Sequence, residues 1–185
     1  MNIPDSFSFI LGEASATYPR NTEGDVIALR DGRLLASWSR FYGGTRDSAG
    51  AHIAARLSSD GGGSWGEPFI LQENVGQQNV MSASFLRERE PGDILLFYLV
   101  KNCSRDLKSY CRRSNDEAQS WGEPVLVTPA DGYQVVNNAR IINFPPAVCL
   151  PPSVSPRTSA SLATVSARSL VTATTAAAPG TERPG

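Results

Sequence analysis

One short pattern occurs twice in this chain and constrains its fold more than any other feature. Residues 58–68 read Ser-Ser-Asp-Gly-Gly-Gly-Ser-Trp-Gly-Glu-Pro, and residues 114–124 read Ser-Asn-Asp-Glu-Ala-Gln-Ser-Trp-Gly-Glu-Pro. The tryptophans of the two copies, Trp65 and Trp121, lie 56 positions apart. An internal repeat of this kind indicates a propeller or an array, in which one unit cannot bury its apolar face alone.

The segments around each copy predict short β-strands separated by turns that contain glycine. Four strands accompany each copy, and a third unit is predicted to begin at 133–143. Four short strands per repeat are typical of a propeller blade. The eight predicted strands cover 25–29, 33–39, 51–57, 68–71, 79–86, 93–100, 108–114 and 125–128.

Within each copy the residue types fit a tight hairpin turn. Asp60 and Asp116 can accept hydrogen bonds from their own turns, and a tryptophan can anchor the hairpin. Ala118 stands where the first copy has Gly62, so if this position needs a positive φ, the second turn is slightly strained. We therefore predict a structural role, and not a catalytic one, for Ser58, Asp60, Gly62, Ser64, Trp65, Ser114, Asp116, Ser120 and Trp121.

The repeated pattern resembles the Asp box, the BNR repeat of the sialidase (neuraminidase) superfamily. The resemblance covers about residues 15–143 and implies an all-β fold, namely two blades and the first strand of a third from a six-bladed β-propeller. It also implies an exo-α-sialidase-like glycoside hydrolase acting on terminal sialic acids or related carboxylated sugars of glycoconjugates. In this family three arginines hold the substrate carboxylate, an Asp is the acid/base, and a Tyr paired with Glu is the nucleophile.

Three positions of the first predicted blade are where the resemblance implies site residues. Arg20 precedes the first strand, in the place of the first carboxylate-binding arginine, although the family's Arg-Ile-Pro pattern is not present there. Arg40 follows the next strand as a second substrate-binding residue, and Asp47 lies in the following loop as the acid/base. For each residue the alternative is a solvated loop charge. The nucleophile pair and the remaining arginines are expected beyond residue 143.

Paired amides begin the third predicted unit. Asn137 and Asn138 are expected to face the central channel and to bond sugar hydroxyls, or else to cap backbone groups where the strand begins. Relatives often carry an acidic residue after the paired Asn, and Ala139 stands there in this chain. Three more carboxyl or phenol groups occur at no diagnostic spacing: Glu23, Tyr42 and Glu73.

The charge balance excludes several classes of partner. With 17 basic and 18 acidic residues, the chain gives no electrostatic argument for binding nucleic acid or an anionic membrane. No run is long and apolar enough to span a bilayer, and residues 1–13 lack the pattern of a signal peptide, so cytoplasm is the default expectation. A single His52 without a Cys/His cluster predicts no metal site, and no cofactor is expected. The three cysteines are expected to be free thiols.

The composition changes after residue 143. Residues 151–185 consist mainly of Ala, Ser, Thr and Pro and contain no aromatic residue, so we predict a partial propeller at 1–143 and a disordered, low-complexity tail at 144–185. One alternative is a native tail. The other is a frameshift, because the shifted codons of 171–180 permit Tyr-Ser-Asp-Asp-Gly-Gly-Arg-Thr-Trp, a third copy of the motif. The second alternative predicts a truncated product.

Three functional hypotheses remain open. A sialidase-like hydrolase predicts that Arg20, Arg40 and Asp47 converge at one end of the propeller. A non-catalytic Asp-box propeller that binds glycans or proteins predicts no convergence, since a fold does not determine a function. A third hypothesis is an inactive product, because two blades leave open sheet edges. The oligomeric state is left open.

Overall fold

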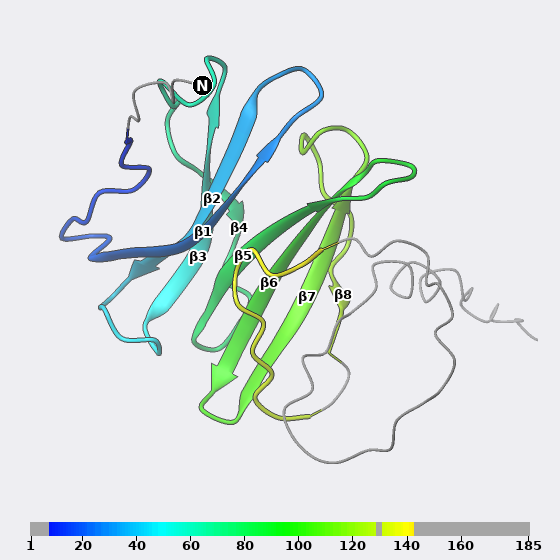
Figure 1. Ribbon diagram of the computed structural model, residues 1–185. Helices are drawn as coiled ribbons and strands as arrows, with labels where there is room; N and C mark the ends of the chain where they lie inside the picture. The colour runs from blue at the N-terminus through cyan, green and yellow to red at the C-terminus, as the bar shows by residue number, and fades with distance from the viewer. Residues whose placement is uncertain (1–7, 129–130, 143–185) are drawn as a thin grey trace, which may run out of the picture. The chain divides into compact units, whose positions relative to one another are not determined.

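The computed structural model of the chain describes residues 8–128 and 131–142. Within this part the chain is all-β: eight strands form two antiparallel four-stranded sheets, without a helix (Figure 1). The predicted tail at 144–185, with its proposed frameshift, lies outside the described residues.

The first sheet contains the first copy of the repeat. Its strands, in spatial order, are β1 (Arg20–Ala28), β2 (Leu34–Tyr42), β3 (Gly50–Ser58) and β4 (Phe69–Gln72). Each strand pairs antiparallel with the next one along the chain. The sheet is therefore a simple meander.

The second sheet repeats this topology around the second copy. Its strands are β5 (Asn79–Arg87), β6 (Ile94–Cys103), β7 (Asp106–Ser114) and β8 (Val125–Leu126), again in sequence order. Each copy of the sequence repeat therefore lies in a four-stranded sheet with the same strand order.

The eight predicted strands are all present, with two differences. β1 begins at Arg20 rather than at residue 25, because a bulge between Thr22 and Gly24 interrupts the alternation of side chains that defines a strand in the sequence. Residues 133–142 form no strand, although Tyr133 makes an isolated parallel bridge with Leu107. A strand requires a ladder of paired residues, and this segment pairs with β7 only at that single bridge.

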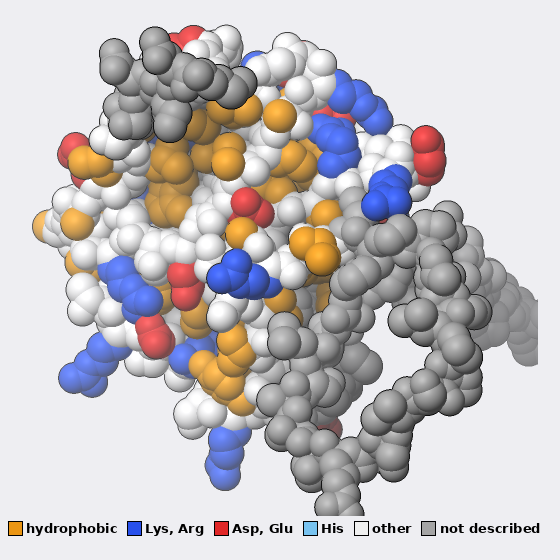
Figure 2. All heavy atoms as spheres, in the orientation of Figure 1, with side chains coloured by type: hydrophobic (Ala, Val, Ile, Leu, Met, Phe, Trp, Pro, Cys, Tyr) orange, Lys and Arg blue, Asp and Glu red, His pale blue; other side chains and the backbone are white. Residues whose placement is uncertain are grey.

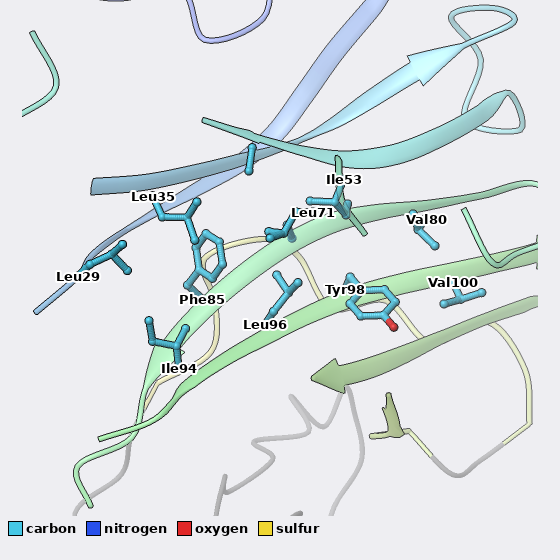
Figure 3. Close-up of a cluster of buried hydrophobic side chains, with 12 residues drawn as sticks. Leu29, Leu35, Ile53, Leu71, Val80, Phe85, Ile94, Leu96, Tyr98 and Val100 are labelled. Atoms are coloured by element: carbon cyan, nitrogen blue, oxygen red, sulfur yellow. The ribbon is translucent and has the colours of Figure 1, made fainter. Parts of the chain in front are cut away.

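Apolar side chains from both sheets meet in one core. Leu35 and Ile53 come from the first sheet, whereas Phe85, Leu96 and Tyr98 come from the second, and all five are buried in the same cluster (Figure 3). Burial of such side chains contributes about 1.5–3 kcal/mol each. Contact between one face of each sheet therefore holds the two repeats together.

The two copies of the motif form the same hydrogen-bonded turn, which we call the repeat turns (Ser58–Trp65 and Ser114–Trp121). In the first, Asp60 Oδ1 accepts from the Ser64 N–H at 2.9 Å, and Asp60 Oδ2 accepts from the Ser64 hydroxyl at 2.6 Å. In the second, Asp116 accepts the corresponding bonds from Ser120 at 2.9 and 2.5 Å. The serine hydroxyl bonds, followed by the backbone bonds, lower the pKa of both carboxyls to about 2. Each aspartate thus bonds its own turn.

The serines that begin the repeat turns also take part. The Ser58 hydroxyl donates to Asp60 Oδ1 at 2.8 Å and accepts from the Gly62 N–H at 2.9 Å. Ser114 makes the equivalent bonds with Asp116 and with the N–H of Ala118, each at 2.8 Å. The tryptophans differ: Trp65 Nε1 donates to the Gly62 carbonyl at 3.0 Å, whereas the buried Nε1 of Trp121 has no partner among the described residues.

Candidate functional site

Four strand ends meet at one end of the two sheets. β1 begins opposite the end of β2, where Arg20 pairs with Phe41, and β5 begins opposite the end of β6, where Asn79 pairs with Lys101. The loop between β2 and β3, residues 43–49, lies at this same end. Loops at one end of a scaffold commonly carry binding residues.

Arg20 and Asp47 form an ion pair at this end. Arg20 Nη1 lies 2.5 Å from Asp47 Oδ1 and also donates to the Thr45 carbonyl at 3.1 Å. The guanidinium carbon lies 4.4 Å from the centre of the Phe41 ring, which fixes the side chain from the other side. The hydrogen bond from Arg20 is the main reason that the pKa of Asp47 is lowered. The side chain of Asp47 is 69% exposed to solvent and that of Arg20 is 28% exposed, so both are accessible.

The second sheet holds the loop that carries Asp47. The buried amide of Asn79 donates from Nδ2 to the carbonyls of Asp47 and Ala49, both at 2.8 Å. The Nζ of Lys101, also a buried residue, donates to the Asp47 carbonyl at 3.1 Å. The position of Asp47 therefore depends on two residues 32 and 54 positions further along the chain.

Arg40 lies apart from this ion pair. Arg40 and Phe41 are consecutive on β2 and so leave opposite faces of the sheet, and Arg20 is on the face of its partner Phe41. The Arg40 guanidinium instead lies over the Tyr18 ring, 3.6 Å from its centre. Its buried Nε has no partner among the described residues. The structure thus brings Arg20 and Asp47 together and places Arg40 on the other face.

The paired amides of the third unit are placed differently from each other. Asn137 is exposed, and its side chain makes no hydrogen bond with the described residues. Asn138 Nδ2 donates to the carbonyl of Gly24 in β1 at 3.0 Å. Asn138 therefore bonds backbone, as the capping alternative predicts, although this does not decide whether it also binds a ligand.

Three cationic side chains lie near this end, and only one of them, Arg20, pairs with a carboxylate of the described residues: Arg20, Arg40 and Lys101. The described residues hold no cluster of three potential metal-binding side chains. They also include no helix of the length and apolarity that crossing a membrane requires. On the face shown in Figure 2, acidic and basic side chains are interspersed among apolar ones.

Lys101 was not identified from the sequence, although the strand pattern contains a signal for it. Lys101 directly follows the apolar run of β6, and its partner Asn79 is the first residue of β5. Polar residues that end one strand and begin its neighbour mark the same sheet edge, and that pattern could have placed both beside the loop of Asp47.

Comparisons with known proteins identify the fold. No protein-family model matches the sequence, and no curated protein matches it. Solved structures do match. A Dyadobacter fermentans protein of unknown function has a TM-score of 0.52 at 17% identity, covering 60% of this chain and 37% of its own. The NanB sialidase of Streptococcus pneumoniae has a TM-score of 0.51 at 13% identity, covering 75% and 40%.

The fold is sialidase-like. A microbial sialidase, Hz136, agrees with this at a TM-score of 0.50 and 14% identity, covering 60% of this chain and 26% of its own. The chain thus spans less than half the length of these structures. At such identities the likeness shows the fold alone and gives no information on the chemistry of the site.

Proposed function

We propose that this chain forms the first part of a sialidase-like glycoside hydrolase that acts on terminal sialic acids or related carboxylated sugars. In this proposal the two sheets are consecutive blades of a six-bladed β-propeller, and residues 133–143 begin a third. The observation that carries the proposal is the Arg20–Asp47 ion pair at the end where β1 and β5 begin.

The chemistry of the pair suits a carboxylated sugar. A guanidinium presents parallel N–H donors that match a carboxylate. Arg20 already binds one carboxylate, that of Asp47, in a partly exposed position. Arg20 can exchange this internal carboxylate for that of a ligand, while Lys101 keeps the neighbouring backbone in place through the Asp47 carbonyl.

This exchange links binding to acid/base chemistry. While Arg20 donates to Asp47, the pKa of Asp47 is lowered and the group is ionised at neutral pH. When a substrate carboxylate takes its place on Arg20, Asp47 loses its main stabilising bond and its pKa rises toward the ordinary value. Asp47 is then better able to hold a proton for the leaving oxygen, which is the role of a general acid.

Two substitutions with opposite expected effects test the proposal. The full chain is titrated with N-acetylneuraminic acid by ligand-observed NMR. Arg20→Met should weaken binding at least about ten-fold, because a charge-assisted bond is lost. Asp47→Asn should strengthen it by about three-fold, because the competing internal anion is removed and an exposed pair is worth up to about 1 kcal/mol.

Arg33→Met is the matched control. Arg33 also pairs with an aspartate, Asp31, with Nε and Oδ2 2.7 Å apart, but it lies in the turn between β1 and β2 at the opposite end of these strands. This variant should bind as the native chain does. If Arg20→Met binds N-acetylneuraminic acid unchanged, the proposed site is wrong.

The second candidate is a glycan-binding module without catalysis. One observation favours it: the pKa of Asp47 is lowered, which is unfavourable for a general acid. Hydrolysis of 4-methylumbelliferyl α-N-acetylneuraminide distinguishes the two. Release of the fluorophore that Asp47→Asn abolishes supports the hydrolase, whereas binding without release supports the module.

A further inference from the structure

Three residues at equivalent positions of the repeat share an uncommon backbone conformation. Glu23, Ser82 and Ala139 have φ values of +53°, +57° and +52°. Ser82 follows Glu23 by 59 positions and Ala139 follows Ser82 by 57, close to the 56 that separate the repeated tryptophans. Left-handed backbone at a residue other than glycine costs about 1–3 kcal/mol and is often found at functional sites. Apart from Glu117 and Ala118 in the second repeat turn, this conformation occurs at one non-glycine residue of each unit among the described residues.

Two of these residues lie in β-bulges of the first strand of each sheet. The register of β1 with β2 shifts between Thr22 and Gly24, and that of β5 with β6 shifts between Met81 and Ser84. A bulge redirects a side chain away from the alternation of the strand and is common beside active sites. The bulges thus reorient Glu23 and Ser82.

Hydrogen bonds join the three segments at these positions. The Ser82 hydroxyl donates to Glu23 Oε2 at 2.9 Å, and the Ser82 N–H donates to the Ser39 hydroxyl at 2.9 Å. The Ala139 N–H donates to the Ser84 hydroxyl at 2.8 Å. The three positions, of which the first and last are 116 residues apart in the chain, therefore lie close together.

Glu23 retains acceptor capacity in this cluster. Its Oε2 accepts from Ser82, while its Oε1 receives no hydrogen bond from the described residues, and the side chain is partly exposed. A carboxylate oriented by one hydroxyl and open on the other side can accept from the adjacent hydroxyls of a sugar.

We propose that Glu23 and Ser82 form a hydroxyl-binding subsite for the same carboxylated sugar whose carboxylate binds Arg20. This rests on the proposed function. Arg20 and Glu23 are three residues apart on β1, about 10 Å at the rise of a strand, a span that a pyranose ring and its substituents cover. Arg20 selects the carboxylate and Glu23 selects the hydroxyls.

Three probes separate the two sites in NMR titrations of the full chain. N-acetylneuraminic acid carries both features, its methyl ester keeps the hydroxyls without the charge, and cyclohexanecarboxylate keeps the charge on a ring without hydroxyls. Glu23→Gln should weaken the acid and the ester about ten-fold, because bonds to a charged acceptor are lost. It should leave cyclohexanecarboxylate within two-fold.

Glu73→Gln is the control, since Glu73 is an exposed loop carboxylate near the same end of the sheets. Ser82→Ala is the second variant, and it tests the subsite if Glu23→Gln does not fold. It should weaken binding of the methyl ester about three-fold.

The outcomes distinguish the two proposals. If the ester does not bind the native chain, or binds the Glu23 and Ser82 variants unchanged, Glu23 only ties two strands and the subsite is wrong. If the ester binds in a Glu23-dependent way but cyclohexanecarboxylate does not bind, the subsite stands and the carboxylate site at Arg20 falls.

Discussion

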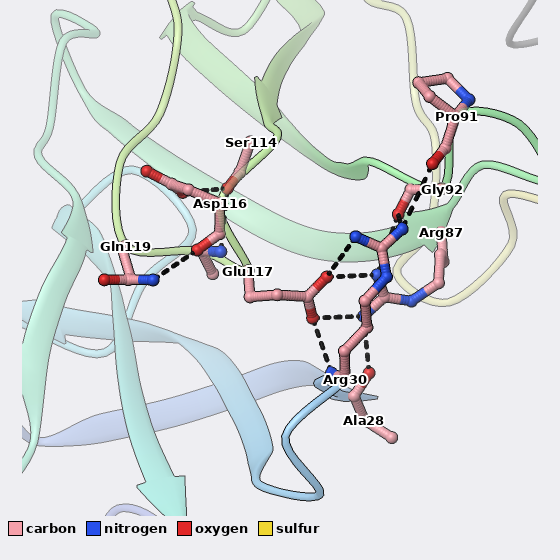
Figure 4. Close-up of polar contacts among 10 residues, drawn as sticks. Ala28, Arg30, Arg87, Pro91, Gly92, Ser114, Asp116, Glu117 and Gln119 are labelled. Carbon is pink, nitrogen blue, oxygen red and sulfur yellow. Dashed lines mark hydrogen bonds and ion pairs between the residues drawn. The ribbon is translucent and has the colours of Figure 1, made fainter.

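Glu117 binds both terminal nitrogens of Arg87, with Nη1 to Oε1 and Nη2 to Oε2 each at 2.8 Å (Figure 4). Glu117 belongs to the second repeat turn and Arg87 ends β5. Glu117 Oε2 also accepts from the backbone N–H of Arg30, in the turn that joins β1 and β2 of the first sheet, at 2.8 Å. One carboxylate therefore connects the two sheets, and the first repeat turn has no counterpart because Gly61 occupies its position.

Glu117→Gln should destabilise the chain by about 1–2 kcal/mol. It removes the negative charge from a bidentate pair, and the Gln amide NH2, which is a donor, replaces one of the two oxygens that accept from Arg87. The free energy of unfolding is measured in urea. Glu123→Gln, an exposed carboxylate just after the same turn, is the control and should change it by less than about 0.5 kcal/mol. Equal stability of both variants would show that Glu117 does not connect the sheets.

Acid should unfold the chain between about pH 4.5 and pH 2. The pKa values of Asp60, Asp116 and Glu117 are each lowered to about 2, the first two mainly by bonds from serine hydroxyls and the third mainly by Arg87. A lowered folded-state pKa gives stability that is present above the ordinary pKa and is lost as the pH falls toward the folded value.

Urea unfolding at several pH values between 6 and 2 measures this loss. The double variant Asp60→Asn, Asp116→Asn should be less stable at pH 6 and should lose less stability toward pH 2.5. A native chain whose stability is constant over this range is the result that contradicts the assignment.

The cysteines should differ in reactivity. Cys103 is exposed, whereas Cys111 is buried, and burial raises the pKa of the Cys111 thiol to about 12. The thiolate is the reactive form. Iodoacetamide at pH 8 should therefore modify Cys103 well before Cys111, with peptide mass spectrometry resolving each site. In urea the two should react alike, and similar rates in the folded chain would refute the burial of Cys111.

Local signals in the sequence predicted the sheets, and long-range contacts determined the site. Alternating apolar residues and turn glycines identify strands, because both act within a few residues. The start of β1 was hidden by the bulge at Glu23, which breaks that alternation. The pairing of Arg20 with Asp47 spans 27 positions, and the bonds of Lys101 to the same loop span 54, so only the folded register brings them together.

The same contrast explains Arg40. Its position after the second strand suggested that it converges with Arg20, but the register of β2 with β1 places it on the other face. A one-residue difference in register moves a side chain across a sheet, and a sequence without its pairing does not specify that register.

Ala118 has the positive φ that the strain prediction requires, and the strain itself can be tested directly. Ala118 has a φ of +65° and Gly62, its counterpart, has a φ of +97°. Ala118→Gly should stabilise the chain by about 0.5–1 kcal/mol, because relief of the left-handed strain exceeds the entropy that glycine adds to the unfolded chain. Gly62→Ala should destabilise it by about 1 kcal/mol or more.

Urea midpoints of both variants check these opposite signs. Ala16→Gly serves as the control, since Ala16 is an exposed loop residue outside the left-handed region, and glycine there should destabilise by up to about 1 kcal/mol. If Ala118→Gly destabilises as much as Ala16→Gly, the second repeat turn is not strained at Ala118, and the two copies of the motif would tolerate either residue at this position.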